Sequence, residues 1–165
     1  MAIALTRIAG AAVLLAGCSG PMTAESFREQ AAGHGSVENL EVNRPLRDVA
    51  ATFRERASAC LQDLRTTTIS GPVTRTTMTK YTFHPTVLVT DRKVELTVQA
   101  LLESHLKLYQ EPANGRYVLV ARAFPIDGTR TRIEIFGPDL FSYRRLHSAV
   151  RGWASGTSTA CPDMS

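Results

Sequence analysis

The sequence lacks the short motifs by which the common enzyme classes are recognised. It contains no Gly-x-Ser-x-Gly motif of the serine hydrolases, no glycine-rich phosphate-binding loop and no His-Glu-x-x-His motif of the zinc proteases. None of its four histidines has a second histidine four residues further on, and a zinc site needs three or four converging ligands. We therefore predict that the protein is not an enzyme, with no catalytic residue, no metal and no cofactor.

Cysteine is scarce, with three residues in all. Cys60 and Cys161 lack the Cys-x-x-Cys spacing of a redox pair. If Cys18 is used elsewhere, they form an even pair, which an oxidising compartment favours as a disulfide. The bridge would close a loop of about 100 residues and contribute about 4 to 5 kcal/mol in the chain-entropy model. The alternative is a buried free thiol at Cys60 and a frayed Cys161.

Long hydrophobic runs are absent from the N-terminal region, where a membrane-spanning helix would need about 20 apolar residues. The run Ile8–Gly17 is shorter and follows a single charge at Arg7, as in a secretory signal peptide. Leu15-Ala16-Gly17-Cys18 then resembles the lipobox of bacterial lipoproteins. The resemblance implies a signal peptide over residues 1–17 and acyl chains such as palmitate on Cys18. The alternative is an ordinary signal peptide with an incidental cysteine.

The residue after Cys18 bears on the destination of such a lipoprotein. It is Ser19 and not aspartate, which resembles the class that Gram-negative cells sort to the outer membrane. Removal of residues 1–17 would leave about 150 residues, enough for a single core. We divide the chain into the signal peptide, a lipidated cysteine with a tether over 18–36, and one domain over 37–165.

The tether is predicted from composition. Residues 19–36 are small and polar, contain glycine and show no sustained apolar period. A flexible coil of that length would have an end-to-end distance of about 20 to 25 Å. It would hold the domain clear of the lipid headgroups.

Lysine is rare, since sixteen of the nineteen basic residues are arginine, and the formal net charge is +4. The arginine bias is typical of a GC-rich coding sequence, and export argues against a nucleic-acid partner. Some arginines recur at spacings that favour a common patch for anionic lipid, lipopolysaccharide or an acidic protein. These are Arg130, Arg132, Arg144, Arg145 and Arg151. The alternative is a solvated surface with Glu134 and Asp139 nearby.

The first half of the domain begins with a strand and a helix. Residues 37–42 alternate in polarity, which predicts a short strand. Pro45 then marks a helix start, and an apolar stripe follows at spacings of three and four. Its members are Leu46, Val49, Ala50, Phe53, Ala57, Cys60 and Leu61. Cys60 is therefore predicted on the buried face near the helix end.

Strand-forming residues dominate the second half. Residues 73–84 form a long strand candidate that Pro85 should kink or end, and 86–89 and 93–103 flank a turn at 90–92. Asn114-Gly115 is a hairpin-type turn, and a second hairpin surrounds Asp127-Gly128. Asp139 can cap a last helix, which Gly156 ends.

This order predicts an α+β fold with an antiparallel β-meander sheet and two helices on one face. It is similar to the helix-grip fold of BamC-type lipoprotein domains of the outer-membrane assembly machinery. The segments NRPLRDVAATF, YVLVARAFPIDGTRTRIEIFG and GWASG followed by CPDM resemble small proteobacterial envelope lipoproteins over residues 40–164. That family has no assigned activity, so the resemblance implies an address and an architecture.

The expected function is that of a lipoprotein anchored to the outer membrane through Cys18, with its domain in the periplasm. It would act as a binding or structural accessory toward an envelope protein or anionic lipid. The alternative is a carrier of a lipid-like ligand, in a cavity lined by residues that otherwise fill a core. These are Phe53, Met78, Tyr81, Phe83, Leu96, Tyr117, Leu119, Phe124, Ile133, Ile135, Tyr143 and Trp153.

Overall fold

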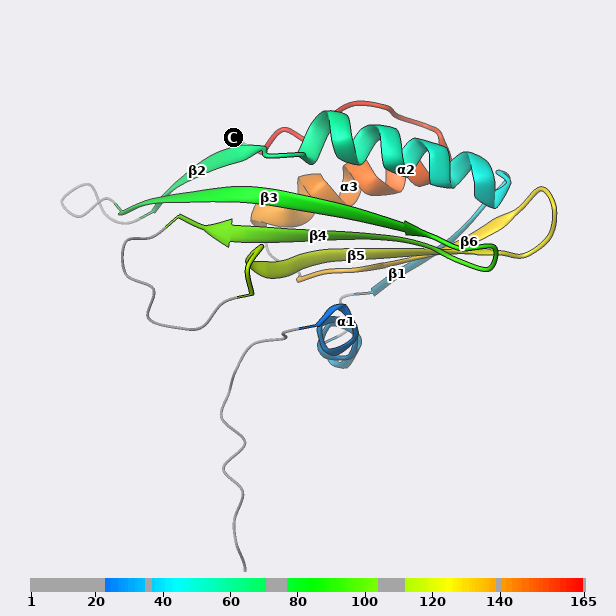
Figure 1. Ribbon diagram of the computed structural model, residues 1–165, viewed down its shortest axis with the longest axis horizontal. Coiled ribbons are helices and arrows are strands. Elements are labelled where there is room, and N and C mark those ends of the chain that lie inside the picture. The colour runs from blue at the N-terminus through cyan, green and yellow to red at the C-terminus, as the bar shows by residue number, and fades with distance from the viewer. Residues whose placement is uncertain (1–22, 35–36, 71–76, 104–111, 139–140, 165) are drawn as a thin grey trace, which may run out of the picture.

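The computed structural model describes residues 23–34, 37–70, 77–103, 112–138 and 141–164. In chain order the elements are α1 (Ala24–Gly33), β1 (Val37–Val42), α2 (Leu46–Leu61), β2 (Arg65–Ser70), β3 (Thr77–Val89), β4 (Val94–Leu102), β5 (Arg116–Pro125), β6 (Thr131–Phe136) and α3 (Phe141–Ser155). The strands form one antiparallel sheet in the order β1-β6-β5-β4-β3-β2 (Figure 1). The predicted α+β fold with an antiparallel meander is confirmed.

Two helices, α2 and α3, lie side by side on one face of the sheet, which we call the inner face (Figure 1). They bury a single large core against it. Its fully buried large side chains are Val49, Phe53, Leu61, Phe83, Val94, Leu96, Val98, Leu119, Ile133, Ile135, Leu146 and Trp153. Burial of this apolar surface is the main force that holds the two layers together.

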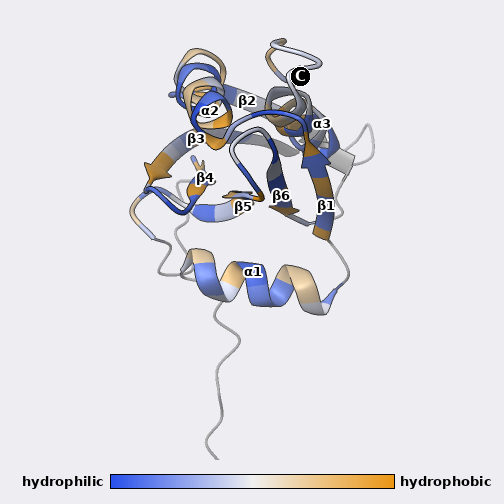
Figure 2. Cartoon of the chain, turned by 90° about the vertical axis from the view of Figure 1, so that its right-hand side faces the viewer, coloured by the Kyte–Doolittle hydropathy of each residue, from blue (hydrophilic) through white to orange (hydrophobic). Residues whose placement is uncertain are grey.

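The third helix, α1, lies on the opposite or outer face of the sheet (Figure 2). Thr23 and Ser26 form a capping box at its start, and Phe27 and Ala31 are buried against Val120 and Phe136. The prediction of a flexible tether over 19–36 is therefore wrong at Ala24–Gly33. Only two of the ten residues are buried, so the apolar period was too sparse to indicate a helix, and packing on the sheet stabilises it.

The predicted helix after Pro45 is α2. Pro45 precedes its first residue and accepts hydrogen bonds at its carbonyl from the backbone of Asp48 and Val49. Asp48 lies in the first turn, where a negative charge is favourable. The predicted apolar stripe faces the sheet, and Cys60 is buried near the end of the helix.

Pro85, predicted to kink or end its strand, does not end it, because β3 runs through it to Val89. Proline lacks an N–H and is tolerated only where a strand has a free edge. The pairing of β2 with β3 ends at Thr82, whereas β4 continues beside β3 to Val89. Pro85 therefore loses no hydrogen bond to β2.

Two glycines adopt the left-handed backbone that other residues rarely take. Gly115, with φ of 83°, closes the turn before β5 by donating its N–H to the carbonyl of Pro112. Gly156, with φ of 75°, follows the last residue of α3, as predicted. The predicted hairpin at Asp127-Gly128 joins β5 to β6. Asp139, predicted to cap α3, lies outside the described residues.

Candidate functional site

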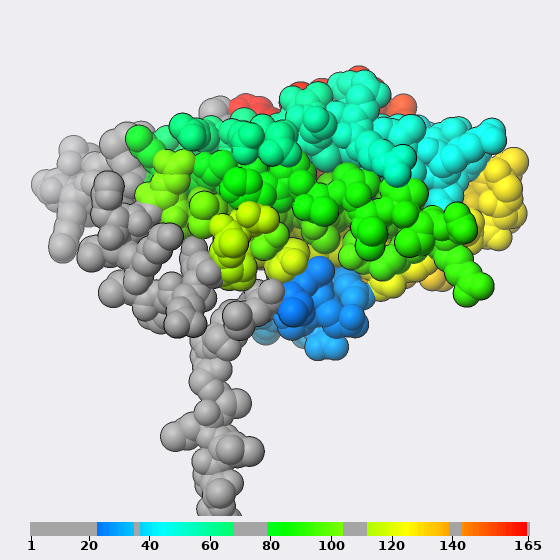
Figure 3. All heavy atoms as spheres, viewed as in Figure 1, coloured from blue at the N-terminus to red at the C-terminus, as the bar shows by residue number. Residues whose placement is uncertain are grey.

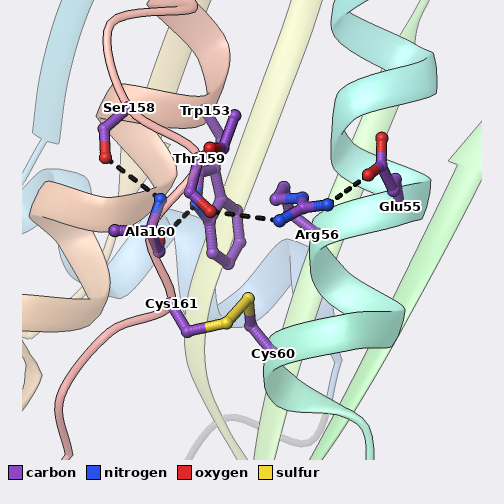
Figure 4. Close-up of a disulfide and its surroundings, with 8 residues drawn as sticks. All are labelled: Glu55, Arg56, Cys60, Trp153, Ser158, Thr159, Ala160 and Cys161. Carbon is purple, nitrogen blue, oxygen red and sulfur yellow. Dashed lines mark hydrogen bonds and ion pairs between the residues drawn. A yellow bond between two sulfur atoms is a disulfide. The ribbon is translucent and has the colours of Figure 1, made fainter.

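The C-terminal residues 156–164, here called the strap, cross from α3 to the end of α2. Cys161 is joined to Cys60 by a disulfide, with the two Cα atoms 5.1 Å apart, as predicted (Figure 4). Arg56 donates to the carbonyl of Thr159, and Arg145 pairs with the Asp163 carboxylate at 2.7 Å. A disulfide in such a small protein indicates an extracytoplasmic location.

Trp153 anchors the strap from inside the core. Its side chain is fully buried, and its indole Nε1 donates to the carbonyl of Ala160 at 2.9 Å. Because Ala160 directly precedes Cys161, the indole lies next to the bridge (Figure 4). The Trp153 indole is therefore placed to report on the state of the bridge.

Arg44 lies just before the start of α2, at the opposite end of that helix from Cys60. Its Nη1 donates to the carbonyls of Trp153 and Ala154 at 2.7 and 3.0 Å, and its Nη2 donates to Thr52 Oγ1 at 2.8 Å. The last carbonyls of a helix lack partners within it and attract cations. The Arg44 guanidinium therefore caps α3 and ties it to α2.

The five arginines proposed as one anionic contact patch are not brought together. Arg132 lies on the outer face and Arg130 at the β5–β6 hairpin, whereas Arg144, Arg145 and Arg151 belong to α3 on the inner side. Four of them pair with acids: Arg130 with Asp127, Arg132 with Glu134, Arg145 with Asp163 and Arg151 with Glu38. The expected patch is wrong, because the sequence spacing did not show which side of the sheet α3 occupies.

The outer face carries a row of alternating charges across three strands, here called the charged row. Lys93 and Arg122 both approach the Glu95 carboxylate, at 3.1 and 3.7 Å. Arg122 and Arg132 approach the Glu134 carboxylate, at 3.8 and 3.6 Å. The row nearly neutralises itself, so it covers the sheet without a strong field of one sign.

Phe124 interrupts the charged row with an apolar ring. The guanidinium carbons of Arg122 and Arg132 lie 4.6 and 5.3 Å from the ring centre, within the range of cation–π contacts. Signals for this arrangement exist in the sequence, since Arg122, Phe124, Arg132 and Glu134 all alternate with core residues. Arg132 was predicted as part of an anionic contact patch and Phe124 as a cavity or core residue, whereas Arg122 was not singled out.

Exposed large hydrophobic side chains occur at one end of the sheet. Among the described residues, Leu88 on β3 is 53 % exposed and Ile126 in the β5–β6 hairpin is 40 % exposed. The pairing register places the β3–β4 and β5–β6 hairpins at the same end. Such side chains on a monomer are candidates for contact with another apolar surface.

Most of the residues expected to line a ligand cavity belong to the core. Phe53, Phe83, Leu96, Leu119, Ile133, Ile135 and Trp153 are fully buried in one cluster, with Tyr81 and Tyr143 packed at its border. Tyr117 and Phe124 are instead on the outer face, and the Met78 side chain lies outside the described residues. This distribution is that of side chains that fill a core.

The histidines are spread over separate elements. His34 caps the end of α1, His84 is on β3 with its Nδ1 4.0 Å from an Asp63 carboxylate oxygen, and His147 is on α3. Within the part of the chain that the structure describes, no three His, Cys, Asp or Glu side chains gather as a metal site would require. His105 lies outside those residues.

Two side chains have shifted pKa values. Burial raises the pKa of Tyr143 to about 12, with a smaller contribution from Tyr81. In the β5–β6 hairpin, hydrogen bonds from the Thr129 backbone and the Arg130 side chain hold the pKa of Asp127 well below its usual range.

The chain can also be compared with known protein families and with curated proteins. No protein-family model matches the chain, and no curated protein is significantly similar to it. The resemblances to proteobacterial envelope lipoproteins and to BamC-type domains therefore stay predictions. In the described residues, no helix combines the length and hydrophobicity of a membrane span.

Proposed function

We propose that the protein is a lipoprotein of the bacterial envelope, anchored through acyl chains on Cys18. The carrying observation is the Cys60–Cys161 disulfide. The disulfide accounts for two of the three cysteines and is typical of an oxidising compartment. The remaining cysteine is Cys18, which stands in the lipobox-like sequence. Acyl chains contribute about 0.8 kcal/mol per buried methylene, and several chains suffice for stable anchoring.

The proposed role is a non-enzymatic binding or structural accessory of the outer membrane, facing the periplasm. Its support is the use of polar side chains: Arg44 caps a helix, Arg145 holds the strap, and Arg122 and Arg132 are paired in the charged row. With these charged groups committed to structural contacts, the exposed Leu88 and Ile126 side chains are the candidates for contact with a partner. An envelope protein or anionic lipid would be such a partner.

The anchoring is tested on the full chain made in a Gram-negative host. Mass spectrometry of the N-terminal peptide should find residues 1–17 removed and Cys18 acylated, and membrane fractionation should place the protein with the outer membrane. A Cys18→Ser variant is the matched control and should stay unacylated. A wild-type chain with a bare Cys18 would contradict the proposal.

The carrier alternative is separated by native mass spectrometry of the domain from residue 19 onward, secreted without its anchor. A bare mass two hydrogens below that of the reduced chain would favour the accessory. Extra mass that survives gentle conditions and is lost on denaturation would favour the carrier.

A further inference from the structure

The connection between Cys18 and the folded domain is much shorter than the predicted tether. Thr23, where the described part of the chain begins, is five residues after Cys18 and caps α1 on the outer face. Five residues span at most about 18 Å when fully extended. An anchor at Cys18 therefore holds the outer face of the sheet close to the bilayer.

We propose that the outer face is the membrane-facing surface and that Leu88 and Ile126 enter the lipid interface. The proposal rests on the acylation of Cys18 and goes beyond it, because it states which surface meets the lipid. The inner layer with α2, α3 and the strap would then face the periplasm (Figure 1).

The helix α1 covers only part of the outer face. Its buried residues Phe27 and Ala31 pack with Val120, Phe136 and Tyr117. The part beyond Val120, toward the β3–β4 and β5–β6 hairpins, holds the charged row and Phe124. Figure 3 shows the two hairpins reaching past α1 at one end of the molecule.

The side chains at this end suit a lipid surface. Leu88 is flanked by core-facing Val87 and Val89, so its own side chain is directed to the outer face, and it is 53 % exposed. Ile126 is 40 % exposed at the neighbouring hairpin. Arg92 is exposed beside Leu88 and suits contact with lipid phosphates, whereas Arg130 is paired with Asp127.

The charged row does not oppose this contact. The carboxylates of Glu95 and Glu134 are each within 4 Å of two cations, so approach of a bilayer would bury neither carboxylate unpaired. Exposed Glu25, Glu29 and Gln30 give α1 a polar outward side. The helix therefore belongs at the headgroup level, with the hairpin end tilted into contact.

The test places a tryptophan reporter on each side of the acylated full-length protein. Leu88→Trp and Ile126→Trp report on the hairpins, and Ala59→Trp, at an exposed site on α2, is the matched control. Each variant is reconstituted in vesicles of phosphatidylcholine and phosphatidylglycerol with brominated acyl chains, which quench only nearby indoles. Trp153 is fully buried and common to all variants.

The expected result is a blue shift and loss of the added emission for Leu88→Trp and Ile126→Trp, with the Ala59→Trp emission unchanged. Two results would overturn the proposed orientation in protein that mass spectrometry shows to be acylated and that is bound to vesicles. One is quenching of Ala59→Trp alone, and the other is quenching of none of the three variants. In either case the proposed anchoring would stand. A chain without acyl groups would overturn both. Far-ultraviolet circular dichroism verifies that each variant is folded.

Discussion

Gly115 illustrates how a single residue holds the sheet in shape. Its φ is positive, and a Cβ there would collide with the carbonyl of Ala100 on β4. Gly115→Ala should lower the free energy of unfolding by about 2 to 4 kcal/mol, through backbone strain and displacement of β4. Gly128→Ala is the control, because a Cβ at Gly128 meets no atom within 4 Å. Equal urea midpoints for the two variants would contradict this explanation.

Tyr143 gives the protein a predictable response to alkaline pH. Its pKa is raised from 10 to about 12 by burial, so between these values the unfolded chain loses this proton before the folded one. Stability is therefore unaffected by this group below pH 10 and falls by about 2 to 3 kcal/mol toward pH 12. Tyr143→Phe should remove that share of the loss. Urea unfolding at several pH values measures it, and identical pH profiles for variant and wild type would refute it.

At the scale of elements, the end of α3 depends on Arg44. Arg44→Met keeps most of the apolar stem but leaves the carbonyls of Trp153 and Ala154 without their cation. We expect a loss of about 2 to 4 kcal/mol, since buried acceptors of charged hydrogen bonds are costly to leave unpaired. Arg47→Met is the matched control, because the Arg47 side chain is 87 % exposed. Thermal unfolding that ranks the two variants equally would rule out the capping role.

The docking of α1 depends on Phe27. A ten-residue helix is marginal alone, and Phe27→Ala removes the larger of its two buried side chains, at a cost of about 3 to 5 kcal/mol in docking. Amide hydrogen exchange should then lose protection across Ala24–Gly33 while α2 keeps it. Gln30→Ala, at an exposed position, should leave the exchange of α1 unchanged. Continued protection of α1 in Phe27→Ala would show that other contacts hold it.

The elements differ in how far sequence predicts them. The period of apolar residues was sufficient for α2, which buries one continuous side against the sheet. β2 was not predicted, because its polar, threonine-rich residues carry no alternating pattern and form a strand only beside β3. Pro85 was misjudged because the free edge of β3 depends on where β2 ends.

For the whole molecule, the disulfide closes most of the domain into one loop. The bridged residues are 101 positions apart, so Cys60→Ala/Cys161→Ala should lose about 4 to 5 kcal/mol in the chain-entropy model. Urea unfolding of the wild type should shift with added reductant, whereas the double variant should not respond. Trp153 fluorescence should rise when the wild type is reduced, because the bridge quenches the adjacent indole. Unchanged fluorescence and midpoint on reduction would contradict both expectations.

The sequence by itself determined the local elements and the disulfide. Strand alternation, the α2 stripe, the hairpin residues and the even pair of cysteines all depend on neighbours in the chain or on simple counting. The tertiary structure alone decided the placement of α1 on the outer face, the passage of β3 through Pro85 and the separation of the arginines onto two sides. Each depends on which surfaces meet across the sheet, because a short helix, an edge proline and a surface charge take their stability from distant partners.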